Sequence, residues 1–332
     1  MSNSPAEDVS ASGGKGQNPS EPFAVPSEPP PSTLKRSAVE TRHRAFSFRR
    51  IGAISTNTLI ELTRQKAFYV ILLFSLLLIG SSMFLARLTF QQEFQVLKDI
   101  SLGAMSIFTS LLAIVATARL LPQDIEDRTV YTILAKPVAR SEYLMGKLLG
   151  VLLLLGISTL VMSAVFLAVL YGREQSVLNE MTAQLNNAPP EQTNDALRAV
   201  RDSAFNENLL PGIAIIYLKA ALLAAMTLFV STFATTNIFT IVVMVFIYFI
   251  GHLQAIARDY WLQAQNAGWL ARSFLAAVAL VFPDLQLFNL TDDVVAGAVI
   301  PLALFGKTLA LGCTYIIVYL SLACALFYGR EL

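Results

Sequence analysis

Residues 67–86 read AFYVILLFSLLLIGSSMFLA, a stretch of twenty residues without a charged side chain. A helix rises about 1.5 Å per residue, so this stretch spans about 30 Å, the thickness of the hydrocarbon core of a bilayer. Arg64 and Lys66 precede it and Arg87 follows it, so the charges stand at its two ends. The pattern predicts a membrane-spanning helix, because lipid offers no partner to an exposed backbone amide.

Five further stretches have the same character, and they predict five more spans. They are Ile100–Ala118, Leu148–Tyr171, Ile213–Ala234, Ile238–Leu253 and Leu304–Tyr328. The composition agrees, since 55% of the residues are hydrophobic and only 14% are charged, against about 25% charged in a soluble domain. We therefore predict an all-α, polytopic membrane protein with six transmembrane helices.

Composition also narrows the classes of function. The net charge of +1 gives no reason to expect a nucleic-acid partner. The chain has two histidines, no CxxC motif, and two cysteines, Cys313 and Cys324, inside one apolar run. On a helix those two thiols lie about 16 Å apart, too far for a disulfide. We predict no dedicated metal site.

The positions of lysine and arginine predict the orientation. Eight basic residues lie in the stretch 35–66 before the first span, five lie in the loop 119–147 between the second and third spans, and Arg330 follows the last span. Six spans place these three segments on one side, and the positive-inside rule makes that side the cytoplasm. We expect a multi-pass protein with both termini cytoplasmic.

The N-terminal part of the chain divides into a tail and a surface helix. Residues 1–34 are rich in Ser, Pro, Gly and Glu, so they cannot bury enough apolar surface to fold alone. We predict a disordered cytoplasmic tail over 1–45 and a transmembrane domain over 46–332. In Phe46–Arg64 the apolar residues recur at helical spacing, which predicts an amphipathic helix on the cytoplasmic surface. Its apolar residues are Ile51, Ile54, Leu59 and Leu62.

Two further segments of the domain do not read as spans. The polar loop 172–210 is predicted to be external, with Asn186–Pro190 as a break between two short helices. The segment 251–303 contains the apolar run Phe274–Phe282, which is too short to cross. We predict an external or re-entrant element there. The alternative is a seventh span over Val294–Phe305, which would put the C-terminus outside.

The stretch ISTNTLIELTRQK, residues 54–66, resembles a surface helix of the type-two export permeases of the ATP-binding-cassette superfamily. The resemblance is to the branch that includes permeases linked to copper-enzyme maturation. In that family the helix reads roughly A-x-N-T-x-x-E-x-x-R-x-K, and Asn57, Glu61 and Arg64 occupy its polar positions. Ser55 stands where alanine is usual.

A more specific resemblance is LPQDIEDRTVYTILAKPVARSEYLMGK, residues 121–147. It is similar to the cytoplasmic loop of the family, roughly E-x-E-x-x-T-x-x-x-L-x-x-P-x-x-R-x-x-x-x-x-G-K, with Asp124 at the first acid. The residues that this match assigns to ATPase coupling are Asp124, Glu126, Arg128, Thr129, Val130, Tyr131, Leu134, Pro137, Arg140, Gly146 and Lys147. The segments 96–103 and 283–289 resemble the family more weakly.

The resemblance implies six spans, a short coupling helix in the loop 119–147, and re-entrant elements before the last span. It also implies a pair of permease subunits, identical or different, on separate ATPase subunits in a bacterial cytoplasmic membrane. ATP would bind on the partner, and this chain would carry no cofactor and no enzyme activity. Gly306-Lys307-Thr308 ends like a phosphate loop, but Pro301 stands where its first glycine is required.

The residues of this loop indicate a docking site for a soluble partner even when the family resemblance is set aside. Val130, Tyr131, Ile133 and Leu134 form an apolar cluster between charged residues, and Pro137 ends it. Ser141 and Glu142 suit the start of the next helix. A short helix with apolar side chains and a charged rim fits a soluble partner. The alternative is a plain connector packed on its own bundle.

Other classes of membrane protein remain open alternatives. No carboxylate lies at mid-depth in the predicted spans, although a secondary carrier usually has one there. A channel, a carrier and a membrane anchor for a complex are the alternatives to a permease driven by an ATPase. Lys219 lies about six residues into the fourth span and is predicted to snorkel to the outer face. The alternative is a role facing the transport path. His252 is predicted to be a hydrogen-bonded interfacial residue.

Overall fold

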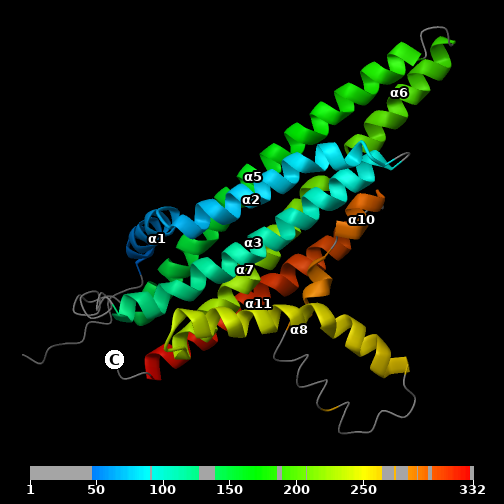
Figure 1. Ribbon diagram of the computed structural model, residues 1–332. Coiled ribbons are helices and arrows are strands. Elements are labelled where there is room, and N and C mark those ends of the chain that lie inside the picture. The colour runs from blue at the N-terminus through cyan, green and yellow to red at the C-terminus, as the bar shows by residue number, and fades with distance from the viewer. Residues whose placement is uncertain are drawn as a thin grey trace, which may run out of the picture. The chain divides into compact units, whose positions relative to one another are not determined.

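The computed structural model describes residues 47–89, 92–126, 139–184, 189–206, 208–263, 273, 283–289, 291–297 and 301–329 (Figure 1). Its elements are helices throughout these ranges, as predicted. The predicted tail 1–45 lies outside the described residues. Most of the loop 119–147 lies outside them as well, because the description stops at Glu126 and resumes at Ala139.

Six helices in the described part of the chain are long and apolar enough to cross a membrane. Each contains one of the predicted spans, except that α7 ends one residue before the predicted end at Ala234, so the six-span prediction is confirmed. They are α2 (Lys66–Ala86), α3 (Glu93–Glu126), α5 (Arg140–Gln184), α7 (Leu209–Phe233), α8 (Asn237–Gln263) and α11 (Leu302–Gly329).

The alternative of a seventh span over residues 294–305 is wrong. A separate short helix, α10 (Thr291–Ala296), ends before this stretch is complete, and α11 begins only at Leu302. Between them Gly297 has a φ of 71°, a left-handed conformation that interrupts a helix and suits glycine. The last turns of α11 then return to the start of α5, where the Arg140 guanidinium donates to the carbonyl oxygens of Phe327 and Tyr328.

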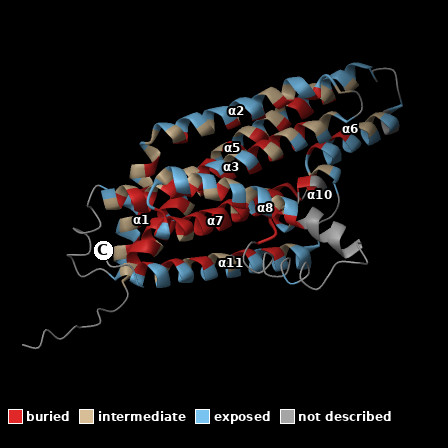
Figure 2. Ribbon diagram, turned by 60° about the horizontal axis from the view of Figure 1, so that its bottom comes forward, coloured by how far each residue is buried: buried red, intermediate tan, exposed pale blue. Residues whose placement is uncertain are grey.

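The core of the bundle is built around α7. Its sequence is apolar on every side, which is typical of a helix that other helices surround. Close approaches hold it there, since a Cβ on Gly212 would meet Val294, and a Cβ on Gly312 of α11 would meet Leu218. Figure 2 shows α7 buried along its length, whereas α2, α8 and α11 keep exposed faces. Those exposed faces are rich in large apolar side chains.

The amphipathic helix is α1 (Phe48–Thr63), and its apolar stripe packs against the start of α5. Ile51 and Leu62 are buried, as the spacing predicted, while Ile54 and Leu59 are half-buried. Two polar residues, Ser55 and Thr58, are buried with them. The buried face of α1 therefore meets protein rather than lipid.

The third span is much longer than its apolar stretch. We predicted an end near Tyr171, but α5 continues to Gln184, and α6 (Pro190–Ala204) returns beside it (Figure 1). The predicted break at Asn186–Pro190 matches the end of α5 and the start of α6. Buried Arg173 helps to continue α5 past the apolar stretch, because it pairs with Glu93 of α3 and with Glu180.

The described part of the segment before α11 packs on the bundle. A 3₁₀ turn, η1 (Leu285–Phe288), follows Asp284, whose carboxylate accepts from the Gln286 amide at 3.0 Å. Leu285 packs against Gly251 of α8, where a Cβ would stand 2.7 Å from the leucine side chain. Residues 264–272 and 274–282 lie outside the described residues, so the re-entrant element stays a prediction.

Candidate functional site

Three helices are joined by one buried lysine at the end of the bundle that carries the loop 119–147. The Lys147 ammonium of α5 lies 2.7 Å from the Asp124 carboxylate of α3 and 3.4 Å from the Glu61 carboxylate of α1. Lys147 is 3% exposed and Asp124 is 7% exposed. All three residues belong to the site that the sequence predicted. A buried charge left without its partner is strongly destabilising, so this cluster fixes the three helices against one another.

Tyr143 extends the cluster to the last span. Its hydroxyl donates to the Asp124 carboxylate, and its ring stacks on Phe327 of α11 with the centroids 6.1 Å apart. Arg140, a predicted site residue, reaches the same helix, donating at 3.1 Å to the Phe327 carbonyl and at 2.9 Å to the Tyr328 carbonyl. Cations suit a helix C-terminus, where carbonyl groups lack helical partners.

Glu142 anchors the other end of α1. Its carboxylate accepts from the Ser47 backbone amide at 2.9 Å and pairs with the Arg50 guanidinium at 3.2 Å. The sequence placed Glu142 at the start of α5 for that helix's dipole. In the structure the same carboxylate also serves the first turn of α1, where amides lack helical partners. Glu142 is 1% exposed, so this contact is a buried one.

Glycine brings α1 and α5 into backbone contact. A Cβ on Gly146 would stand 2.7 Å from the Ile54 side chain, and a Cβ on Gly150 would stand 2.6 Å from Thr58. The Ser55 carbonyl oxygen would be 2.8 Å from the latter Cβ. Two small residues four apart on one helix allow such close packing in membranes. Gly146 was predicted from the family motif, but Gly150 was missed, although its spacing from Gly146 is visible in the sequence.

The remaining predicted residues are not drawn into this cluster. Asn57 is exposed on α1, Arg64 is exposed directly after α1, and Glu126 is exposed at the end of α3. Six of the predicted residues lie outside the described residues: Arg128, Thr129, Val130, Tyr131, Leu134 and Pro137. The structure therefore shows the base from which the loop leaves and to which it returns.

The contacts at this base connect helices to one another. The base consists of ion pairs, a tyrosine and close glycine packing, and the described residues hold no group of three His, Cys, Asp or Glu side chains able to bind a metal. Sequence reasoning missed Tyr143, Glu142 and Arg50 as members. Their partners come from α1, α3 and α11, so their contacts depend on tertiary packing rather than on local spacing.

Lys219 corrects a prediction in the interior of the bundle. It does not snorkel, because its side chain, which leaves α7 between α3 and α8, is only 2% exposed. Its ammonium lies 3.2 Å from the Ser106 hydroxyl and 3.0 Å from Nε2 of His252. It also stands 5.7 Å from the centroid of the Tyr248 ring. These polar partners lie within reach inside the protein, so the side chain need not extend to water. His252 is hydrogen-bonded, as expected.

Comparison with protein family models identifies the family of the chain. Residues 31–332 match the family model described as ABC-2 family transporter protein. The chain belongs to the ABC-2 family. No individual curated protein matches the sequence. As an ABC-2 member with six apolar helices, the chain is the membrane permease type of ABC transporter component, in agreement with the resemblance of the loop 119–147.

Proposed function

We propose that this ABC-2 chain is the membrane-spanning subunit of an ATP-driven exporter, powered by a separate ATPase that docks on the loop 119–147. Family membership supports the permease class. The observation that supports docking at this loop is the buried contact of Lys147 with Asp124 and Glu61, which joins the helices on either side of the loop to α1.

In this proposal the base of the loop carries force into the bundle. A push on residues 127–138 acts on the end of α3 and on the start of α5 together, because the Asp124–Lys147 pair joins them. The same movement reaches α1 through the Gly146 and Gly150 contact. It reaches α11 through Arg140. A loop that moved alone would leave the transport path unchanged, whereas a loop on this base moves four helices.

Orientation, assembly and location are part of the same proposal. The end of the bundle that carries α1 and the last turn of α11 faces the cytoplasm, in accordance with its lysine and arginine content. A second permease subunit, identical or different, pairs with this one in the bacterial cytoplasmic membrane. The exposed apolar faces of α2, α8 and α11 would be covered by lipid and by that subunit. ATP binds on the partner ATPase, not on this chain.

Purification of the tagged full-length chain from its native membrane in mild detergent tests the proposal. We expect an ATPase subunit to co-purify in a fixed ratio, and reconstituted transport to require both that subunit and ATP. The control is the same purification of an unrelated six-span protein. Substrate transport by the lone chain, driven by an ion gradient, would instead make it a secondary carrier.

A further inference from the structure

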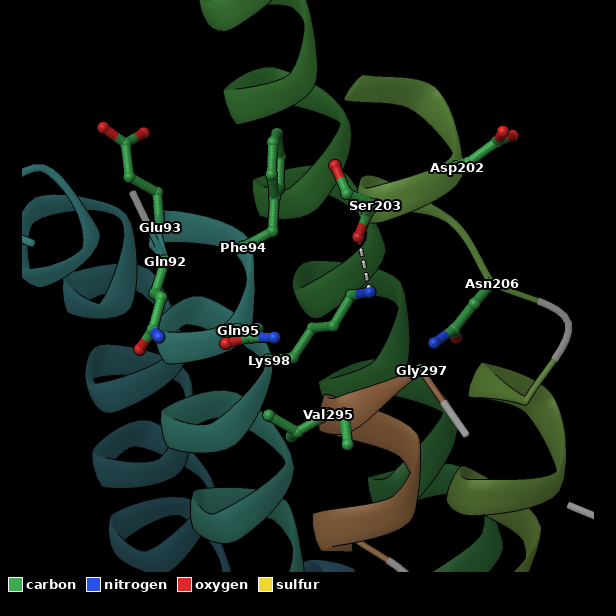
Figure 3. A pocket seen from close by; sticks show the side chains of 11 residues that line it. Gln92, Glu93, Phe94, Gln95, Lys98, Asp202, Ser203, Asn206, Val295 and Gly297 are labelled. Atoms are coloured by element: carbon green, nitrogen blue, oxygen red, sulfur yellow. Dashed lines mark hydrogen bonds between the residues drawn. The ribbon is translucent and has the colours of Figure 1, made fainter. Parts of the chain in front are cut away.

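A polar pocket of about 470 Å³ lies at the end of the bundle away from α1, between α3, α6 and α10. Figure 3 shows the side chains that surround it. Its volume falls in the range of ligand sites rather than of single-water cavities. The lining residues are Gln92, Glu93, Phe94, Gln95, Lys98, Asp202, Ser203, Asn206, Val295, Ala296 and Gly297. No part of the proposed ATPase coupling uses this pocket.

The pocket contains a buried cation, Lys98, which is 3% exposed. Its ammonium donates to the Ser203 carbonyl oxygen at 2.7 Å. An ammonium has three donors, and among the described residues this one has no other hydrogen-bond acceptor and no carboxylate within ion-pair distance. A buried cation normally has a counter-ion, because burial removes the water that would otherwise stabilise its charge.

The carboxylates nearby are turned away from this cation. Glu93 is held by the Arg173 guanidinium, and in Figure 3 both Glu93 and Asp202 point out of the pocket. Lys98, Gln95 and Asn206 point into it. Glu93 and Asp202 therefore belong to the lining but direct their carboxylates outward, whereas the Lys98 ammonium points into the pocket, where it can bind an anion.

Asn206 is a lining residue of the same pocket with a fixed side chain. Its side-chain amide donates to the Val294 carbonyl at 2.9 Å, so the amide is fixed in place. Its Oδ1 is buried and finds no donor among the described residues. That oxygen is closed to water, so a ligand in the pocket does not touch it. The chemistry of the ligand therefore follows from Lys98, whose ammonium has two donors left for anionic oxygens.

The level of the pocket in the membrane favours a phosphate group. Lys98 precedes the predicted start of the apolar stretch at Ile100 by two residues, so its ammonium stands near the polar headgroup layer. A phosphodiester presents anionic oxygens to an ammonium and to amide donors at once. We propose that this pocket binds a phosphate ligand, of the kind that phosphatidylglycerol carries in its headgroup.

Calorimetric titration of the purified full-length chain in neutral detergent tests this site. The probes are short-chain phosphatidylglycerol, its phosphate-free diacylglycerol analogue, and free glycerol 1-phosphate. We expect phosphatidylglycerol to bind and diacylglycerol not to bind. Lys98→Met should weaken binding by about tenfold or more, since a charge-assisted bond is lost. Lys307→Met is the matched control, because Lys307 is an exposed lysine near the start of α11 and does not line the pocket.

A second variant separates loss of the site from loss of the fold. Ala296→Phe keeps Lys98 and fills the pocket, so it should weaken binding to a similar extent in a chain with unchanged thermal stability. Lys98-dependent binding of glycerol 1-phosphate would support the phosphate site and identify a soluble ligand. Binding of phosphatidylglycerol alone would identify the lipid. Equal affinity in the Lys98→Met, Ala296→Phe and unmodified chains, or no binding of either phosphate probe, would overturn the proposal.

Discussion

Substituting Gly150 by alanine is expected to loosen α1 from the bundle while the six spans stay in place. The new Cβ would stand 2.6 Å from the Thr58 Cβ and 2.8 Å from the Ser55 carbonyl oxygen. Non-bonded carbon atoms are comfortable at about 3.5–4.0 Å, so α1 must withdraw by about 1 Å. The Ser55 oxygen is backbone, so a change of rotamer cannot relieve this contact.

The expected magnitude follows from this overlap. Overpacking of this kind costs about 1–3 kcal/mol, which corresponds to a roughly five- to 150-fold larger population of undocked α1. Alanine is also a better helix former than glycine by about 1 kcal/mol, a gain that acts within α5 and not on α1. Gly172→Ala measures that gain by itself, because Gly172 lies on the same helix with no atom within 4 Å of its added Cβ.

Amide hydrogen exchange of the detergent-solubilised chain is the measurement. In Gly150→Ala, peptides from residues 48–63 should exchange faster by the factor above, and peptides from α7 should exchange as before. Gly172→Ala should leave both sets unchanged. If the α1 peptides of Gly150→Ala exchange at the rate found in Gly172→Ala, then α1 is not held by close packing on α5.

Three other predictions follow from the structure and the charge pattern. Lys147→Met should lower the free energy of unfolding by about 3–5 kcal/mol, because Asp124 stays buried without its cation. Adding Asp124→Asn should restore part of that loss, and denaturant unfolding in detergent measures both. Lys219→Ala should lower the free energy of unfolding by about 1–3 kcal/mol, because Ser106 and His252 lose a buried hydrogen-bond partner. In the unmodified chain a water-soluble amine reagent should leave Lys219 unlabelled. Labelling would restore the snorkelling interpretation. Reporter fusions should show Leu332 in the cytoplasm and the Pro189 loop outside, and an external Leu332 would contradict the six-span orientation.

The spans were predictable because the lipid bilayer sets the length and the apolar character of a helix that crosses it. A lipid-facing helix needs about twenty apolar residues, and that requirement is visible in stretches such as 67–86. The extension of α5 to Gln184 was not predictable from apolarity, since the helix continues through polar residues. It is supported there by contacts such as Arg173 with Glu93, which lie 80 positions apart in the chain.

The candidate site was predictable only in its family residues. The motif pointed to Asp124, Gly146, Lys147 and Glu61, and the structure brings them to one end of the bundle. Tyr143 was missed because its partners are on other helices. The prediction for Lys219 was wrong for a related reason. The position of a residue within a span gives its distance from the membrane surface, but it does not show which polar side chains of other helices lie closer. Ser106 and His252 come from other helices, α3 and α8.

The central claim is that an ATPase docks on the loop 119–147, and a double variant in that loop tests it most directly. Tyr131→Asp with Leu134→Asp places carboxylates where we propose an apolar contact. Their unpaired burial would cost at least several kcal/mol, enough to weaken docking by more than about a hundredfold. Leu210→Asp, an exposed leucine near the opposite end of the bundle, is the control.

The measurement is the yield of ATPase that co-purifies with each variant from membranes, with insertion checked separately by protease protection. We predict normal insertion of both variants, an ATPase yield near background for the double variant, and an unchanged yield for Leu210→Asp. If the double variant inserts normally and retains the ATPase at the unmodified yield, then the loop 119–147 is only a connector and the proposed mechanism is wrong.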